Sequence, residues 1–174
     1  MAWTTPLTAV SNTALTAAQW NASVRDNLLT TPAALATTDS QWVVSSGANS
    51  VVARRPDFGN TVSASQSTSS TSFVDLATVG PTLTMTTGVR GLCLWGCQLT
   101  NSSGAANSYM SFTGANFTAS TTASVQNAGT AAIQASYTLF LNGMTAGSNT
   151  FTAKYSCSSG TGTFQDRRLQ VLPF

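Results

Sequence analysis

The chain has 174 residues, a formal net charge of +2 and only 7% charged residues. Its length allows one domain with a hydrophobic core and a smaller attached region. The few basic residues are scattered, which excludes the basic stripe that nucleic-acid binding requires, and no apolar stretch is long enough to span a membrane. We therefore expect no nucleic-acid partner and no membrane association. The first residues lack a secretion signal, so we expect a soluble protein made in a cytoplasm.

The sequence also lacks the groups that most enzymes and metal sites use. It contains no His and no Glu, and its five acidic residues are Asp spread along the chain. A Ser or Cys nucleophile therefore has no His to activate it, although two Asp could still meet in space as a glycosidase pair. Three cysteines, Cys93, Cys97 and Cys157, are interpreted as small buried thiols. We expect no catalytic residue, no cofactor and no metal site.

The first predicted element is a helix over Thr16–Leu29. Thr16 and Gln19 have the spacing of a capping box, in which each side chain bonds the backbone of the other residue. The large apolar residues that follow recur at four-residue steps and form one stripe: Trp20, Val24 and Leu28. A helix of this length is not stable alone, so the stripe should be buried against another surface.

A small hairpin is predicted over residues 41–54, where two β-prone runs flank a connection that contains Gly and Asn. Helix and hairpin together make up an N-terminal attachment segment, residues 1–56, which has too little apolar mass to fold alone. We expect this segment to lie on a partner or on its own trimer mates. The predicted attachment residues are Trp20, Val24, Leu28 and Trp42.

Residues 57–71 are rich in Ser and Thr and are interpreted as a linker. Over residues 72–174, β-prone runs separated by turn residues recur about every ten residues. The predicted strands are Ser72–Thr78, Thr82–Thr86, Val89–Thr100, Ser108–Gly114, Ala131–Leu141, Thr150–Cys157 and Thr163–Leu172. With no second helix, the pattern predicts a mainly β protein whose C-terminal domain, residues 72–174, is a jelly-roll β-sandwich.

One predicted strand is apolar on both faces, over Leu92–Cys97. A two-layer sandwich covers one face of such a strand and leaves the other bare, so the strand needs a second cover. A neighbouring subunit in a three-fold arrangement provides one. The predicted trimer interface is then Leu92, Leu94 and Trp95. The alternative is a central strand that the protein's own long loops cover.

Five aromatic residues fit two interpretations: Tyr109, Phe112, Phe117, Tyr137 and Phe140. On an exposed face they would form a patch that stacks on sugars, whereas on the inner faces of strands they would pack in the core. Most of them fall on strand spacing together with other apolar residues, which favours the core.

Several segments resemble virion proteins of tailed phages and prophages. At the N-terminus these segments are Trp3–Pro6, Leu15–Asn21 and Val24–Leu28, and the hairpin Trp42–Arg54 resembles a segment of phage fibres and capsid-attached proteins. Towards the C-terminus, the segments Gly147–Thr152, Gly160–Phe164 and Arg167–Leu169 resemble the end of the jelly-roll heads of such proteins. The trimers of these heads are similar to the tumour-necrosis-factor and C1q class.

This resemblance implies a non-enzymatic structural protein on the surface of a phage virion, of the head-fibre, capsid-decoration or minor tail type. Its N-terminal segment would bind the major capsid protein or a neighbouring virion protein, and its jelly rolls would project outward as a homotrimer. One alternative is a tail-associated receptor-binding protein that holds host surface glycans with loop-tip residues at 101–107 or 115–122. Another is a freestanding carbohydrate-binding module.

Overall fold

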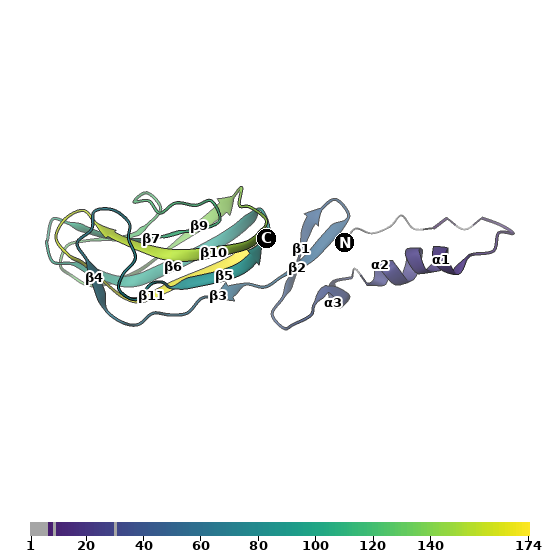
Figure 1. The fold of residues 1–174 in the computed structure, drawn as a ribbon, viewed down its shortest axis with the longest axis horizontal. Helices are drawn as coiled ribbons and strands as arrows, with labels where there is room; N and C mark the ends of the chain where they lie inside the picture. Colours follow the sequence, from purple (N-terminus) through teal and green to yellow (C-terminus); the bar gives the residue numbers. More distant parts are fainter. Residues whose placement is uncertain (1–6, 9, 30) are drawn as a thin grey trace. The chain divides into compact units, whose positions relative to one another are not determined.

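The computed structural model describes residues 7–8, 10–29 and 31–174 (Figure 1). The chain is mainly β, and its sheets are antiparallel. It divides into two compact units, which are described separately. Residues 1–55 together with Phe174 make up the N-terminal unit, and residues 56–173 make up the β unit.

The N-terminal unit contains one helical run inside the predicted range 16–29. It consists of α1 (Ala17–Trp20), a π-helical segment η1 (Asn21–Arg25) and α2 (Asp26–Leu28). A capping box starts the run: the Thr16 hydroxyl accepts a bond from the Gln19 amide (3.2 Å), and the Gln19 side chain accepts one from the Thr16 amide (3.0 Å). A further short helix, α3 (Pro32–Leu35), was not predicted. It begins at a proline, whose fixed φ suits the first turn of a helix.

A two-stranded hairpin completes the N-terminal unit. Strand β1 (Trp42–Gly47) pairs with β2 (Ser50–Arg54), and Trp42 lies opposite Arg54. Asn49 in the turn has a φ of 52°, in the left-handed region that Asn tolerates better than most residues. The hairpin thus lies within the predicted range of residues 41–54.

The β unit is built from two antiparallel sheets. The first sheet has the strand order β5 (Thr82–Thr87), β10 (Gly147–Cys157), β7 (Asn107–Thr113) and β8 (Val125–Ala128). The second sheet has the order β3 (Asp57–Phe58), β11 (Gly162–Pro173), β6 (Arg90–Asn101) and β9 (Ile133–Asn142), and β4 (Gln66–Thr68) also pairs with β11. The longest strands, β6 and β11, pair with one another at the centre of the second sheet.

The inner faces of the two sheets meet in one hydrophobic core. Trp95 of the second sheet is 1% exposed, and its ring contacts Phe112 of the first sheet edge-on at 4.8 Å between ring centres. Its indole nitrogen donates a hydrogen bond of 3.0 Å to the carbonyl oxygen of Met110, so the one polar atom of this side chain is satisfied. Inward-facing residues such as Phe151 and Leu169 are fully buried around it. The alternation expected of a half-buried strand therefore holds along the central strands.

The segment interpreted as a linker belongs to the β unit. Within residues 57–71, β3 and β4 both pair with β11, and Val62 forms a bridge with Arg167. The Ser67 and Thr163 hydroxyls share a hydrogen bond of 2.8 Å across the β4–β11 pair. One of the Ser and Thr side chains that suggested a linker, that of Ser67, is thus a bonded partner of a long strand. In contrast, the predicted strand at residues 72–78 contributes one bridge, between Val74 and Tyr155, and β8 was not predicted.

A bulge in β11 sets the direction of its side chains. Gln165 lies opposite Gln98 and Arg168 opposite Gly96, so two residues, Asp166 and Arg167, share the position opposite Cys97. Asp166 has a φ of 50°, which accommodates the extra residue. As a result Arg167 points into the core and is 0% exposed, whereas Arg168 is exposed on the outer face.

The buried Arg167 is held by oxygen atoms of the segment between β3 and β5. One terminal nitrogen donates to the carbonyls of Thr78 and Gly80 at 3.3 and 3.4 Å. The other donates to the carbonyl of Ala64 at 3.4 Å and to the Gln66 side chain at 3.2 Å. Within the described part of the chain, no carboxylate forms an ion pair with this guanidinium. We call this arrangement the Arg167 clamp, because it ties residues 64–80 to β11.

Candidate functional site

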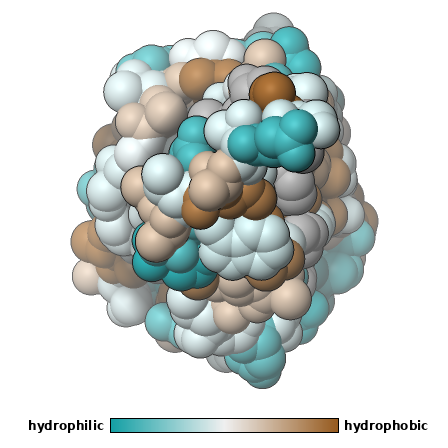
Figure 2. Space-filling view, turned by 90° about the vertical axis from the view of Figure 1, so that its right-hand side faces the viewer, coloured by the Kyte–Doolittle hydropathy of each residue, from teal (hydrophilic) through white to brown (hydrophobic). Residues whose placement is uncertain are grey.

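The predicted attachment residues lie on two elements of the N-terminal unit. Trp20 and Leu28 on the helical run are 56% and 59% exposed, and Val24 between them is half-buried. Trp42 lies at the start of β1, where it is half-buried and its ring stacks on Phe174 at 5.6 Å between centres. Figure 2 shows one face of the molecule, on which apolar residues (brown) reach the surface among hydrophilic ones (teal).

Four further apolar residues of the N-terminal unit are exposed and were not predicted: Leu7, Val10, Leu15 and Leu29. Leu15 directly precedes the capping box and Leu29 directly follows α2, so both extend the apolar surface of the helical run. The four-residue spacing of the predicted stripe does not reach them, because three of them precede the helix and Leu29 lies one position past Leu28. Exposed large apolar side chains grouped on a short helix mark a candidate interaction surface.

The predicted interface residues separate onto opposite faces of β6. Leu92 and Leu94 are half-buried and point to the outer face of the second sheet. Trp95 points to the inner face and is 1% exposed, because it fills the space between the two sheets. Trp95 is therefore a core residue of the β unit. Of the three predicted interface residues, Leu92 and Leu94 are the two that face outward.

Two neighbouring strands extend this apolar surface. Leu92 lies opposite Leu172 on β11 and opposite Phe140 on β9, so the three residues form one row across the second sheet. Phe140 is 48% exposed, which corrects its interpretation as a core aromatic. The residues at the end of β9 are apolar one after another, so the sequence shows no alternation that would tell which of them face outward. We call Leu92, Leu94, Phe140 and Leu172 the apolar end of the outer face.

The same face becomes polar towards Gly96, where it holds a cavity of about 370 Å³. Its lining comes from three adjacent strands: Leu94, Trp95 and Gly96 on β6, Gln134, Ala135 and Ser136 on β9, and Arg168 and Gln170 on β11. Among the described residues, the side chains of Gln134, Ser136, Arg168 and Gln170 have no hydrogen-bond partner. We call this site the polar cavity. It was not predicted, because it depends on the register of three strands that are far apart in sequence.

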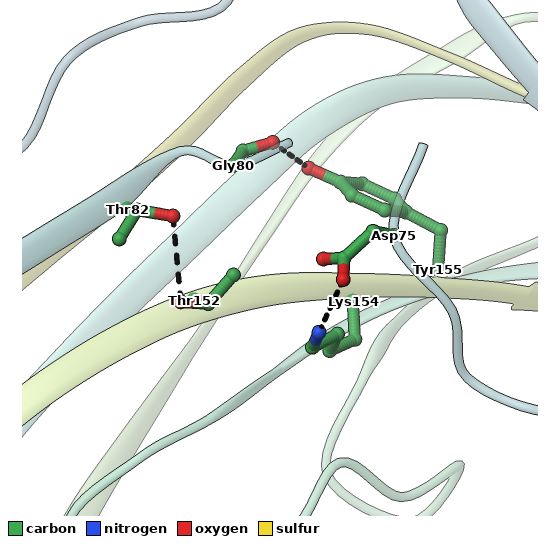
Figure 3. Close-up of polar contacts among 6 residues, drawn as sticks. All are labelled: Asp75, Gly80, Thr82, Thr152, Lys154 and Tyr155. Atoms are coloured by element: carbon green, nitrogen blue, oxygen red, sulfur yellow. Dashed lines mark hydrogen bonds and ion pairs between the residues drawn. The ribbon is translucent and has the colours of Figure 1, made fainter. Parts of the chain in front are cut away.

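The opposite outer face, on the first sheet, has a different character. The Thr84 and Thr150 hydroxyls share a hydrogen bond of 2.7 Å, and Thr82 donates one of 3.4 Å to Thr152. Lys154 forms an ion pair of 2.7 Å with Asp75 (Figure 3). These polar side chains are therefore satisfied by one another, whereas those of the polar cavity are open to a ligand.

The loop expected to contact glycans at residues 101–107 is built around a structural residue. Asn101 is 2% exposed, and its side chain bonds the Ser103 amide at 2.9 Å and the Ser159 carbonyl at 3.1 Å. In the other loop, at residues 115–122, Asn116 donates to the Thr145 hydroxyl at 3.0 Å. The Asn101 amide is buried and holds its loop in place, whereas Asn116 is exposed and donates one hydrogen bond within the protein.

The described residues provide little acid–base or metal chemistry. No group of three His, Cys, Asp or Glu side chains among them could hold a metal ion, and none of their helices is long and apolar enough to cross a membrane. Burial raises the pKa of Cys93 and of Cys97 from 9.0 to about 12, so both stay protonated thiols near neutral pH. Such thiols are poor nucleophiles.

Comparison with known proteins does not assign the chain to a family. No protein-family model matches the chain, and a search of curated proteins finds no significant match.

Proposed function

We propose that this protein is a non-enzymatic structural protein of a tailed-phage particle, a capsid decoration or head-fibre protein. The N-terminal unit attaches it to the major capsid protein or to a neighbouring virion protein, and the β unit is presented outward. The observation that carries the proposal is the exposure of Trp20 and Leu28, 56% and 59%, on a short helical run in a unit separate from the β unit.

The energetics of this surface favour a partner. A helical run of three turns is marginal in water unless its apolar side packs on something. Burying Trp20 and Leu28 against a shell protein would contribute about 1.5–3 kcal/mol per side chain before the cost of ordering. Three copies in one oligomer would add avidity, which can strengthen binding by about 10²–10⁴-fold.

The β unit is suited to the outer part of such a protein. We assign its two antiparallel sheets to a jelly roll, and we assign the apolar end of the outer face to contacts within a homotrimer. Leu92, Phe140 and Leu172 form the row that a neighbouring subunit would cover. Obligate interfaces of this kind bury about 2,000 Å² or more and are largely apolar.

The test is binding to phage particles that lack the native copy of the protein. Full-length protein should bind them, and Trp20→Ala should weaken binding at least tenfold, because it removes the largest exposed apolar side chain of the helical run. Arg25→Ala is the matched control, since Arg25 is an exposed residue of the same run whose ion pair with Asp26 lies at the surface. It should bind like the wild type. Equal binding of Trp20→Ala and the wild type would contradict attachment through the helix.

A further inference from the structure

The polar cavity on the outer face of the second sheet has the features of a ligand site, and we propose that it binds an acidic saccharide, a sugar ring that carries a carboxylate. This proposal goes beyond the virion role and does not rest on it. At about 370 Å³ the cavity lies within the size range of small-ligand sites, about 300–1,000 Å³.

The register of the three strands explains why a cavity forms here. Gly96 lies opposite Arg168 on one side and opposite Ser136 on the other, so the middle position of this row has no side chain. The two flanking strands are separated by two strand spacings, about 10 Å, which leaves room for one ring. A Cβ atom at Gly96 would lie only 2.6 Å from the Ala135 carbonyl oxygen, so the backbone itself requires glycine at the floor.

The polar groups of the cavity match the hydroxyls of a sugar. Gln134 and Gln170 each offer an amide with two donor hydrogens and an acceptor oxygen, and Ser136 offers a hydroxyl. Because these side chains have no partner among the described residues, a ligand needs to displace only water from them. Leu94 supplies an apolar wall for the C–H surface of the ring.

The charge of the site selects an acidic ligand. Arg168 is exposed and is the one charged residue among the eight that line the cavity, and none of the eight is acidic. A guanidinium binds a carboxylate through two parallel hydrogen bonds, a geometry that lysine lacks. Arg168 therefore gives a sugar acid an interaction that the corresponding neutral sugar cannot form.

The polar cavity shares one residue with the apolar end assigned to subunit contacts, but the rest of its lining lies outside that surface. Leu92 lies four residues from Gly96 on the same strand, a distance of about 13 Å. Leu94 lies between them and contributes to both surfaces. A homotrimer joined through the row of Leu92 can therefore leave the cavity open beside the subunit interface.

Titration calorimetry of the full-length protein tests the proposal with named probes. The acidic probes are glucuronic acid, galacturonic acid and N-acetylneuraminic acid, and the neutral probes are glucose and galactose. At least one acid should bind at least tenfold more tightly than the neutral sugars, and the difference should shrink in high salt. If no acid binds more tightly than the neutral sugars, the proposal is wrong.

Variants then identify the site. Arg168→Gln should abolish the preference for the acid, Arg168→Lys should restore only part of it, and Gln134→Ala should weaken acidic and neutral sugars alike. Arg90→Gln, at an exposed arginine outside the cavity lining, is the control and should leave binding unchanged. Unchanged binding in Arg168→Gln would show that the acid binds elsewhere and would overturn the assignment.

Two further variants separate this proposal from the virion role. Trp20→Ala should retain full saccharide binding even where it loses attachment to particles. If binding is absent in the wild type but appears when Leu92→Asp dissociates the oligomer, a neighbouring subunit covers the cavity, and the proposal fails while the trimer stands.

Discussion

The guanidinium of Arg167 lies 5.4 Å from the centre of the Tyr155 ring, and both side chains bond the same carbonyl oxygen, that of Gly80. The Tyr155 hydroxyl donates to this oxygen at 2.8 Å (Figure 3), and Arg167 donates to it at 3.4 Å. The positive charge thus rests on a ring face and on oxygen dipoles instead of a carboxylate. This arrangement joins the two sheets to the irregular segment that precedes β5.

Replacing Arg167 should destabilise the β unit. Arg167→Met keeps much of the volume but removes four hydrogen bonds, to the carbonyls of Thr78, Gly80 and Ala64 and to the Gln66 side chain, each worth about 0.5–1.5 kcal/mol net. Removing a buried charge offsets part of this cost. We expect a net loss of about 2–4 kcal/mol in the free energy of unfolding, measured by denaturant titration.

The neighbouring arginine provides the control for this change. Arg168→Met alters an exposed side chain of the same strand and should change the free energy of unfolding by less than about 0.5 kcal/mol. If both variants are equally stable, the Arg167 clamp does not stabilise the fold.

Alkaline pH should destabilise the protein through its buried thiols. Burial raises the pKa of Cys93 and Cys97 from 9.0 to about 12 and also raises the pKa of Tyr155. Above pH 9 the unfolded chain loses these thiol protons while the folded chain keeps them, so unfolding releases protons. The stability contributed by the neutral thiols is therefore complete below pH 9 and falls as the pH rises towards 12, by about 1.4 kcal/mol per pH unit for each thiol.

Denaturant titrations at pH 8 and pH 10.5 measure this slope. The double variant Cys93→Ala/Cys97→Ala should show a shallower dependence, whatever its stability at pH 8. The interpretation fails if the wild type is equally stable at both values, or if the double variant has the same slope.

Disrupting the apolar end of the outer face should dissociate the proposed trimer. Leu92→Asp places an unpaired charge in a dry contact, and Phe140→Ser removes the most exposed residue of the row. Sedimentation equilibrium should show a trimer for the wild type and monomers for both variants, with circular dichroism checking that the fold is kept. Thr84→Asp, on the opposite outer face, should remain trimeric. A monomeric wild type at micromolar concentration would exclude the trimer.

Removing residues 1–55 should leave a folded β unit. Residues 56–173 contain both sheets and the whole hydrophobic core cluster, including the Arg167 clamp. The truncated protein should unfold cooperatively at a temperature within a few degrees of the full-length chain, but it should not bind phage particles. A loss of the cooperative transition would show that the N-terminal unit is needed for the β fold.

Local patterns predicted much of the fold. The capping box of Thr16 and Gln19 marks the start of the helical run, and the alternation in β10 and β11 marks strands that the structure contains. These signals come from residues close in sequence. The short strands β3 and β4 gave no signal of this kind, because their place depends on β11 and on Arg167, about 100 residues away.

The candidate sites were less accessible to sequence reasoning. Alternation places Leu94 and Trp95 on opposite faces of β6, but both faces of this strand are apolar, so the sequence does not show which of them faces the core. The polar cavity requires Gly96, Ser136 and Arg168 to stand in one row, and only the pairing of β6 with both β9 and β11 brings them together.

The bulge in β11 has a consequence for how this protein can evolve. The extra residue at Asp166 and Arg167 shifts the phase of the strand, which allows Phe164 before it and Leu169 after it both to face the core. Substitutions along this strand change one side chain at a time. Loss of a single codon at position 166 would remove the extra residue and leave Arg167 opposite Cys97 in regular pairing, with Leu169 still facing the core. Loss of a codon elsewhere in the strand would instead turn the residues that follow it to the other face of the sheet. We therefore expect lineages of this protein to vary in residue type along β11 and to change its length only at the bulge.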